Sequence, residues 1–485
     1  MQQLQTTQAA SVWSYFLKIC AIPHPSRHER TLVEWIFSWA KEHNISCKQD
    51  NIGNLILVKP ASAGYEAKTP VILQAHLDMV PQKNSDKVHD FTTDPIIPII
   101  DGEWMHADNT TLGADNGVGM SSCLAVLASD QIAHGPLEVL LTAGEEIGMV
   151  GAFGLAPNLF EGKILINTDS EQEGDLYIGC AGGIRLYTDI PYQEVAVKSE
   201  HVSYEVALKG LKGGHSGCDI DLLRGNAITL LASALVDCTD IPYDLCSMEG
   251  GSLRNAIPRE AQAIITCAIQ DHDRLNQLIS RLNISLQKKF AGIEDSMQLS
   301  LSACSLPKAA LSLKSKSDLL NALKDCPNGI FEMDPNLDSV VQTSSNLGVL
   351  TQTTGDNSVF TMEMLVRSQV DAEKQHYVEK IFEYFQQYGG IGRREGDYPG
   401  WKPNTDSAIY RLVKKQYQVL FGHSPQTMVI HAGLECGLFS SKYPNWDMIS
   451  FGPTIKFPHS PDEKVHIPSV DKYWKLLIAT LEAIE

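Results

Sequence analysis

The segment Val71-Ile-Leu-Gln-Ala-His76-Leu-Asp78 decides the fold class. A short, mostly apolar run of this kind is typical of a strand buried on both faces of a parallel sheet. The run ends in His-x-Asp, and because side chains alternate along a strand, His76 and Asp78 are expected on the same face. The segment therefore predicts a central strand with polar groups at its carboxyl end.

Strands and helices alternate outward from this segment. Apolar runs at 54–58, 137–141 and 164–167 predict further buried strands, and the small-residue-rich stretch 113–129 predicts a helix. Residues 8–42 show helical spacing of apolar side chains, broken at 23–25 by two prolines. This alternation predicts an α/β domain whose mostly parallel sheet is covered by helices in three layers.

The pattern changes near residue 185. The region after it predicts two successive modules of strands plus two helices, each resembling an open sandwich. A glycine-rich connector is predicted at 389–400, after which the α/β pattern returns. We therefore expect an α/β domain at 1–186 and 399–485, interrupted by an inserted α+β domain at 187–398. The predicted strands of the insert are 201–208, 255–269, 297–303 and 338–368, and its predicted helices are 226–236, 275–290, 317–323 and 371–388.

Composition narrows the class of protein. The 485 residues include 39 Lys and Arg against 58 Asp and Glu, a net charge of −19 that disfavours nucleic acid and anionic membrane surfaces as partners. No signal peptide and no apolar window of about 20 residues is expected. The eleven cysteines are scattered without a CxxC pair, which indicates reduced thiols and a cytoplasmic location. A small peptide substrate is compatible with this balance.

Five polar positions at strand ends and loops carry the expected chemistry. Ligands bind at the carboxyl ends of strands in open α/β sheets, where His76, the Glu145-Glu146 pair and Asp169 are predicted to gather. Asp115 opens a helix, and His459 lies in a distant loop. Two histidines with several carboxylates suit Zn²⁺ or another borderline divalent ion. Two ions a few Å apart would need a bridging group, for which Asp115 could serve, and one of two adjacent glutamates can bind metal while the other transfers protons.

Each position also has a structural interpretation on its own. A His-x-Asp pair at a strand end can cap neighbouring backbone, an Asp before a helix is commonly an N-cap, and a Glu-Glu pair is commonly solvated. Asp169 could cap the next segment of the chain, and His459 could be an ordinary loop histidine. The joint occurrence of all five at suitable positions favours the metal site.

Together the motifs resemble the di-zinc exopeptidases of the aminoacylase, carboxypeptidase and dipeptidase superfamily, and most closely its aminoacyl-histidine dipeptidase branch. One departure from the relatives is the Thr142-Ala143-Gly144 stretch before the intact glutamate pair, where they tend to carry bulkier or polar residues. The resemblance extends over almost the whole chain. The stretches that carry it are ICAIPHPS (19–26), VILQAHLDMVPQKN (71–84), TLGADNGVGM (111–120), INTDSEQEGDLYIGCAGG (166–183), LKGLKGGHSG (208–217), SLRNAIPRE (252–260), YPGW (398–401), IHAGLECGLF (430–439) and GPTIKFPHSPDEKVHI (452–467).

The resemblance implies a ligand set for two zinc ions per subunit, with Co²⁺ or Mn²⁺ as substitutes. His76 and Asp169 would hold one ion. Glu146 and His459 would hold the other, and Asp115 would bridge the two.

The resemblance also implies catalytic and substrate-binding roles. Asp78 would orient His76, and Glu145 would be the general base. The insert would be a lid, in which His215 polarises the scissile carbonyl. Asn255 and Arg367 would hold the C-terminal carboxylate of the substrate.

The implied activity is hydrolysis of dipeptides, with a preference for Xaa-His that includes β-Ala-His. The same metal frame could instead deacylate N-acyl amino acids or act as an aminopeptidase on short peptides. An inactive binding protein on a peptidase fold is the alternative of another class, although all six catalytic and ligand positions are filled. A di-metal phosphatase is disfavoured, because the GGHSG segment has no place in one.

The oligomeric state implied by the resemblance is a homodimer, favoured over a monomer. Relatives that dimerise through the lid supply its histidine across the interface. Because the insert here is doubled, our hypothesis is that its second half takes part of the partner's role and that His215 acts in cis.

Overall fold

The computed structural model describes residues 2–238, 240–355 and 357–485. Its internal contacts divide the chain into two compact units. The first unit runs to Cys180 and resumes at 401–429 and 434–485, and the second comprises 181–400 and 430–433. The expected boundaries were 186/187 and 398/399. The short segment 430–433 was not expected to leave the α/β domain.

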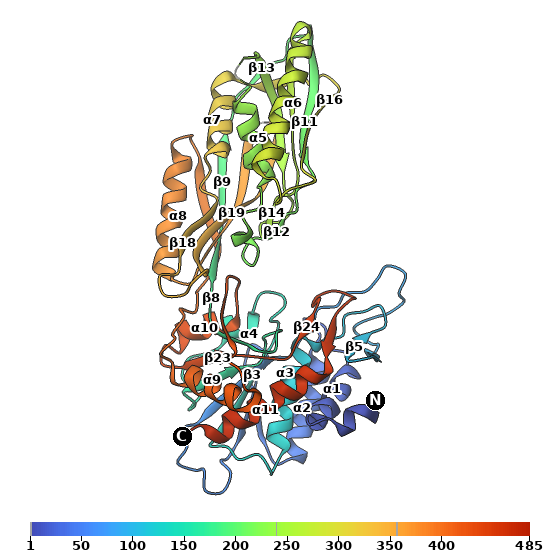
Figure 1. Ribbon diagram of the computed structural model, residues 1–485, viewed down its shortest axis with the longest axis vertical. Helices are drawn as coiled ribbons and strands as arrows, with labels where there is room; N and C mark the ends of the chain where they lie inside the picture. Colours follow the sequence, from blue (N-terminus) through green and yellow to red (C-terminus); the bar gives the residue numbers. More distant parts are fainter. Residues whose placement is uncertain (1, 239, 356) are drawn as a thin grey trace. The chain divides into compact units, whose positions relative to one another are not determined.

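The first unit is built on an eight-stranded mixed sheet, which confirms the predicted α/β class (Figure 1). Its four neighbouring strands β6, β3, β7 and β23 run parallel, while β1 and β2 are added in antiparallel order at one side. Along the sheet the order is β1 (Ser46–Gln49), β2 (Leu55–Lys59), β6 (Leu137–Thr142), β3 (Val71–His76), β7 (Ile164–Asn167), β23 (Asp447–Ser450), β8 (Asp175–Cys180) and β22 (Gln426–Ile430).

Helices of the first unit share one apolar core with this sheet. Helix α1 buries Val12, Trp13, Phe16 and Ile19, the spacing of one helix face. Helix α3 is buried on all sides, which its small residues permit against β3. The helices are α1 (Ala10–Cys20), α2 (Arg30–Glu42), α3 (Ala114–Ala128), α4 (Val150–Gly154), α9 (Ala408–Phe421), α10 (Glu435–Lys442) and α11 (Ile467–Ala483), with a 3₁₀ turn at Gln2–Thr6. A small sheet adds β4 (Pro98–Asp101), β5 (Trp104–Ala107), β24 (Ile455–Lys456) and β25 (Lys464–His466).

The second unit has a nine-stranded antiparallel sheet made of two halves. Each half has the chain order strand, helix, strand, strand, helix, strand. If the four strands of a half are numbered 1 to 4 along the chain, they lie side by side in the sheet in the order 4-1-3-2 in both halves. The first half is β11 (His201–Lys209), α5 (Ala227–Val236), β13 (Tyr243–Gly250), β15 (Ala261–Ala268), α6 (His272–Lys289) and β16 (Gln298–Ala303). The second half is β9 (Gly182–Pro191), α7 (Leu313–Lys324), β19 (Val341–Thr353), β20 (Val359–Ser368), α8 (Asp371–Gln386) and β21 (Ile391–Tyr398), with β18 (Gly329–Met333) added on β19.

The halves are nested, whereas the sequence predicted two successive modules. The first half is inserted between β9 and α7 of the second, and the short pair β10 (Glu194–Ala196) and β17 (Ala309–Leu311) joins the ends of the insertion. Sequence order alone could not reveal this, because β9 pairs with β20 far along the chain. The remaining short elements are β12 (Gly214–His215), β14 (Ala256–Ile257) and 3₁₀ turns at Ile220–Leu222 and Ile269–Asp271.

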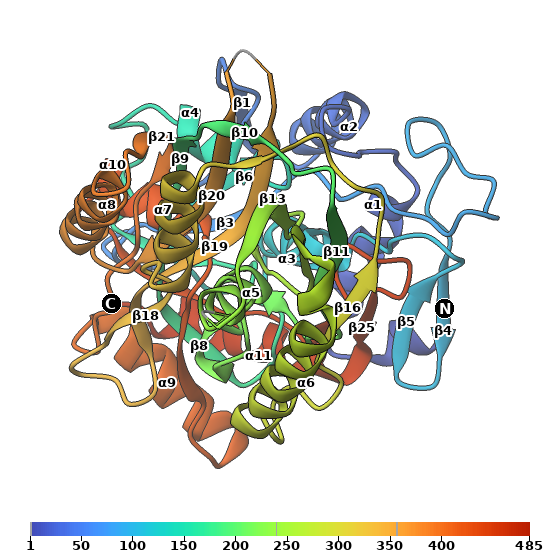
Figure 2. The ribbon, with the colours of Figure 1, turned by 90° about the horizontal axis from the view of Figure 1, so that it is seen from above.

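Helices α5, α6, α7 and α8 cover one face of the second unit's sheet (Figure 2). Alternate residues of β20, namely Phe360, Met362, Met364 and Val366, point into the core that these helices share. Arg367 therefore lies on the other face. The prediction of a connector at 389–400 was wrong, because β21 occupies most of it. This edge strand is exposed and charged, so it lacks the apolar alternation that predicts strands.

Among the described residues, no helix combines the length and apolar character needed to cross a membrane.

Candidate metal centre

Three parallel strands end at the same edge of the first unit's sheet. His76 is the last residue of β3, the Glu145-Glu146 pair follows β6, and Asp169 follows β7. Because β3 lies between β6 and β7 in register, these side chains emerge as neighbours. Asp115 comes to the same place from the start of α3, where its peptide bond to Asn116 is cis.

Asp115 lies between the two predicted ligand histidines. Its Oδ1 is 3.1 Å from His76 Nε2, and its Oδ2 is 3.1 Å from His459 Nε2. On the first side, Asp169 Oδ1 lies 3.3 Å from His76 Nε2. On the other side, Glu146 Oε2 lies 3.0 Å from His459 Nε2. The structure thus groups these residues as two pairs that share one carboxylate.

These spacings suit a pair of zinc-like ions. Nitrogen and oxygen ligands about 2.0–2.2 Å from a tetrahedral zinc ion lie about 3.3–3.6 Å apart. The four His-to-carboxylate distances, 3.0–3.3 Å, are close to this separation. Glu146 Oε1 is buried without a hydrogen-bond partner in the described part of the chain, so one carboxylate oxygen is free to bind a cation. The residues therefore fit two divalent ions.

Asp78 supports both sides of this arrangement. Its carboxylate accepts the backbone N–H of Glu145 at 2.9 Å and of Glu146 at 3.3 Å, and the hydroxyl of Ser26 at 2.7 Å. His76 Nδ1 donates to the Asp78 backbone oxygen at 2.9 Å and lies 3.6 Å from its Oδ1. Asp78 therefore fixes the loop that carries the glutamates as well as the ring of His76.

The site concentrates carboxylates for which the described part of the chain supplies no lysine or arginine partner. Burial raises the pKa of Glu145 and Glu146, and burial with nearby carboxylates raises the pKa of Asp169 to about 6. Hydrogen bonds to Asp115 and Glu146 raise the pKa of His459 to about 11. Among the described residues, the ion pairs of the ligand carboxylates are with histidines alone. Bound divalent cations would neutralise this charge.

Three further acids, the buried Glu435 and Glu463 and the half-buried Glu171, were not identified from the sequence. Burial raises the pKa of Glu171 to about 9, of Glu435 to about 8 and of Glu463 to about 7. Glu463 accepts four backbone N–H groups from the loop 112–115 and so anchors Asp115. Glu435 contacts side chains of β3 and β6. The partners lie hundreds of residues away in the chain, which a local sequence pattern does not reveal.

The second unit brings His215 and Arg367 together. Arg367 Nη2 lies 3.4 Å from His215 Nε2, and its Nη1 donates to Tyr398 Oη at 3.2 Å. Arg367 is 4% exposed, and its Nε has no hydrogen-bond partner in the described part of the chain. A buried guanidinium with only neutral partners is suited to an anionic ligand.

His215 is held as a neutral hydrogen-bond donor. Its Nδ1 accepts the backbone N–H of Gly217 at 3.2 Å and of Cys218 at 3.0 Å, which leaves the proton of the neutral ring on Nε2. The 3.4 Å approach of Arg367 Nη2 to this Nε2 is therefore a contact between two donors and not a hydrogen bond. Burial and the charge of Arg367 lower the pKa of His215 to about 4. The backbone oxygen of Asn255 accepts the N–H of Ser216, and the Asn255 side chain is exposed beside this loop.

His431 is a second histidine of this region that sequence reasoning did not single out. It lies in the segment 430–433, and its Nε2 is 2.8 Å from Ser344 Oγ. Burial, followed by the charge of Arg367, lowers its pKa to about 3. Its presence in the quoted stretch IHAGLECGLF was the available signal.

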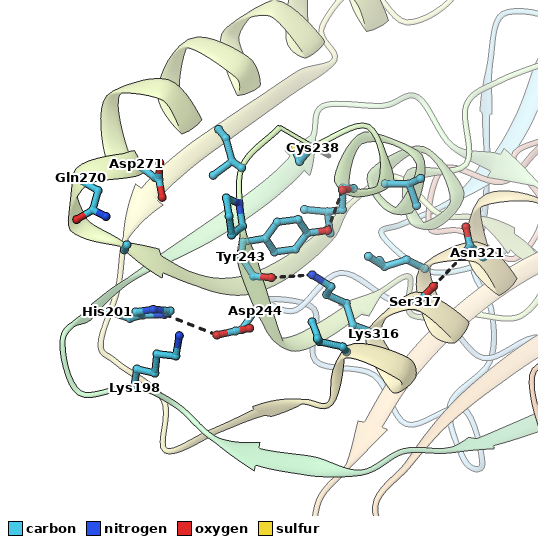
Figure 3. A pocket seen from close by; sticks show the side chains of 17 residues that line it. Lys198, His201, Cys238, Tyr243, Asp244, Gln270, Asp271, Lys316, Ser317 and Asn321 are labelled. Atoms are coloured by element: carbon cyan, nitrogen blue, oxygen red, sulfur yellow. Dashed lines mark hydrogen bonds and ion pairs between the residues drawn. The ribbon is translucent and has the colours of Figure 1, made fainter.

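A cavity of about 530 Å³ also lies in the second unit, but it contains none of the predicted site residues (Figure 3). Two of its polar side chains contact other groups of its lining. His201 faces Asp244 at 3.6 Å, and Lys316 donates to the Tyr243 backbone oxygen at 2.7 Å. The cavity therefore lacks the carboxylate and histidine cluster of the first unit.

Comparison with known proteins gives consistent matches over the whole chain. Residues 72–483 match the family model described as peptidase family M20/M25/M40. The cytosol non-specific dipeptidase of Escherichia coli (strain K12) is 48% identical over 485 residues, covering 100% of this chain and 99% of that protein.

Comparison with solved structures agrees with these sequence matches. The aminoacylhistidine dipeptidase from Vibrio alginolyticus superposes with a TM-score of 0.92 at 46% identity, covering 100% of this chain and 99% of that one. The aminopeptidase PepT from Bacillus cereus has a TM-score of 0.61 at 16% identity, covering 99% of both chains, and supports the fold alone.

Proposed function

The chain belongs to peptidase family M20/M25/M40 and is a metallopeptidase, and on this premise we propose that it hydrolyses dipeptides, Xaa-His dipeptides among them. The two similar proteins are named a non-specific dipeptidase and an aminoacylhistidine dipeptidase. A substrate range that includes β-Ala-His is compatible with both names. The name of the Escherichia coli relative also supports a cytosolic location.

The observation that carries the proposal is the position of Asp115 between His76 and His459. We propose that His76 and Asp169 hold one zinc ion, that Glu146 and His459 hold the other, and that Asp115 bridges them. When bound, the two ions supply Lewis-acid chemistry and lower the pKa of water at the site. Co²⁺ and Mn²⁺ would substitute, since the same nitrogen and oxygen donors suit them.

Glu145 is the proposed general base. Its backbone is fixed by Asp78, and burial raises the pKa of its carboxyl, as a proton carrier near neutral pH requires. Its carboxylate takes a proton from the attacking water and then gives that proton to the nitrogen of the leaving amine. Asp78 acts as a positioning residue that keeps Glu145 and Glu146 in different orientations.

Residues of the second unit would recognise two groups of the reacting peptide, the scissile carbonyl and the C-terminal carboxylate. We propose that His215 donates Nε2–H to the scissile carbonyl oxygen as negative charge develops there. Arg367 and Asn255 would bind the substrate's C-terminal carboxylate, for which a planar guanidinium is suited. We retain a homodimer as the proposed assembly, with the alternative that His215 acts within its own chain.

Hydrolysis of a small peptide panel tests the proposal. The panel comprises β-Ala-His, Gly-His, Ala-Leu, Gly-Gly-His and an N-acetyl amino acid, each assayed with and without added Zn²⁺. We expect cleavage of the dipeptides, loss of activity with a chelator, and a fall of about 10²–10⁴-fold in kcat in Glu145→Gln with metal content unchanged.

The pattern of substrates separates the alternatives. Activity on Xaa-His alone would assign the histidine preference, and equal activity on Ala-Leu would assign a general dipeptidase. Activity confined to the tripeptide or to the acetylated compound would replace the dipeptidase assignment with an aminopeptidase or a deacylase. Stoichiometric metal without any hydrolysis would indicate a binding protein.

A further inference from the structure

Glu435 is a fully buried carboxylate beneath the proposed metal centre. It is the first residue of α10 and is 1% exposed. Its Oε2 accepts a hydrogen bond from Gln74 Nε2 at 2.6 Å and one from Thr142 Oγ1 at 2.7 Å. Gln74 and Thr142 are themselves completely buried, on the neighbouring strands β3 and β6. The carboxylate therefore joins β3, which ends at His76, to β6, which ends at Thr142 shortly before Glu145.

The second oxygen of this carboxylate is unsatisfied. Oε1 of Glu435 has no hydrogen-bond partner in the described part of the chain, and both partners of Oε2 are neutral. Glu138, near the opposite end of β6, shows the contrast. Its carboxylate accepts the backbone N–H groups of Glu161 and Gly162, at distances down to 2.8 Å, and no oxygen is left without a partner.

A hydrogen-bonded chain connects Glu435 to a proposed metal ligand. Gln74, which accepts Asn167 Nδ2 at 2.5 Å through its Oε1, links β3 to β7. Asn167 Oδ1 in turn accepts the backbone N–H of Asp169 at 3.2 Å. Gln74 is also two residues before His76 on the same strand face. A substitution of Glu435 would therefore alter the positions of both proposed ligands of one ion, His76 and Asp169.

Burying an ionised carboxylate in this position is energetically unfavourable unless an opposite charge lies nearby. Removing an ionised carboxylate from water is strongly unfavourable, and neutral donors offset only part of that cost. The chain supplies no cationic side chain to Glu435 among its described ion pairs and hydrogen bonds. The charge of His76 offsets part of this cost in the metal-free protein, and the proposed metal ions are a further source of positive charge, so the carboxylate and the ions would stabilise each other.

We propose that Glu435 is a positioning residue of the metal centre, which fixes the ends of β3, β6 and β7 and whose negative charge raises the affinity for the ions. This inference rests on the proposed metal centre. It assigns to Glu435 opposite effects on two measurable states. The carboxylate destabilises the metal-free protein and stabilises the metal-bound one.

Glu435→Gln separates these effects. The amide keeps an oxygen that accepts from Gln74 and Thr142, so the substitution removes the charge and leaves both hydrogen bonds possible. The affinity for Co²⁺ and Zn²⁺ is measured without substrate, by the visible absorbance of Co²⁺ and by competition with a chelating indicator. We expect both affinities to fall by about 10- to 100-fold. The urea midpoint of the metal-free variant should be unchanged or higher.

Glu138→Gln is the matched control, because it removes a buried carboxylate that is bound to the same sheet but lies away from the site. Its metal affinity should equal that of the unsubstituted protein. Affinity within twofold of the unsubstituted protein in Glu435→Gln would overturn the proposal, as would a metal-free variant that is less stable or does not fold. Failure of the unsubstituted protein to bind metal would overturn the metal centre itself, which keeps the two failures distinct.

Discussion

At the scale of single residues, the two units place charge in opposite ways. In the first unit, carboxylates are crowded around Asp115 with histidines as their partners. In the second unit, Arg367 is buried beside neutral groups, and burial together with the charge of Arg367 lowers the pKa of His215 and His431. One region therefore favours bound cations and the other favours a bound anion.

Substitution of Arg367 by lysine tests the anion site. Lysine keeps the charge but loses the planar pair of donors, so we expect KM for a dipeptide to rise about 10- to 100-fold with a smaller change in kcat. The measurement compares each dipeptide with its C-terminal amide. The preference of the unsubstituted protein for the free carboxylate should largely disappear in Arg367→Lys.

Arg393→Lys is the control for this variant, because Arg393 is exposed on β21. It should leave both substrates unaffected. An undiminished preference for the free carboxylate in Arg367→Lys would remove Arg367 from carboxylate recognition.

At the scale of elements, the close approach of α3 to Thr168, the residue after β7, supports the metal centre. A Cβ at Gly119 would lie 2.2 Å from Asn116 Oδ1 and 2.4 Å from Thr168 Oγ1. Asn116 Nδ2 donates to Asp169 Oδ1 at 2.5 Å and to the Thr168 backbone oxygen at 3.0 Å. The absence of a side chain at Gly119 therefore lets the helix hold a proposed ligand in place.

Sequence and structure predict opposite effects of Gly119→Ala on the stability of the protein. Helix propensity alone would stabilise α3 by about 1 kcal/mol. The contacts with Asn116 and Thr168 predict instead a net loss of about 1–3 kcal/mol in the free energy of unfolding, because neither neighbour is the free end of a long side chain. Urea denaturation of the metal-free protein measures the change, and a gain in stability would show that the packing relaxes without cost.

The same elements show what the sequence could and could not predict. The run ending at His76 was recognisable because an apolar strand followed by polar residues is a local pattern. The supporting role of Glu435 was not, since its partners Gln74 and Thr142 lie on other elements far along the chain. The polar Gln74 within an apolar strand was the one local signal of a buried partner. The nesting of the two halves was also hidden, because it depends on the pairing of β9 with β20.

At the scale of the whole molecule, each unit has its own apolar core. All five proposed metal ligands belong to the first unit, whereas His215, Asn255 and Arg367 belong to the second. A ligand that binds only the native state stabilises the unit that holds it. We propose that the two units are domains that respond separately to metal.

Removal of metal should therefore act on one unit alone. We expect calorimetry to show two unfolding transitions, since separate cores unfold as separate cooperative units. A chelator should lower the Tm of one transition by several degrees, because ions at 100 times their Kd contribute about 2.7 kcal/mol. Tryptophan fluorescence assigns that transition, since all seven tryptophans lie outside the residues of the second unit. The other transition should keep its Tm, and a single transition that shifts as a whole would mean that metal binding and both cores form one cooperative structure.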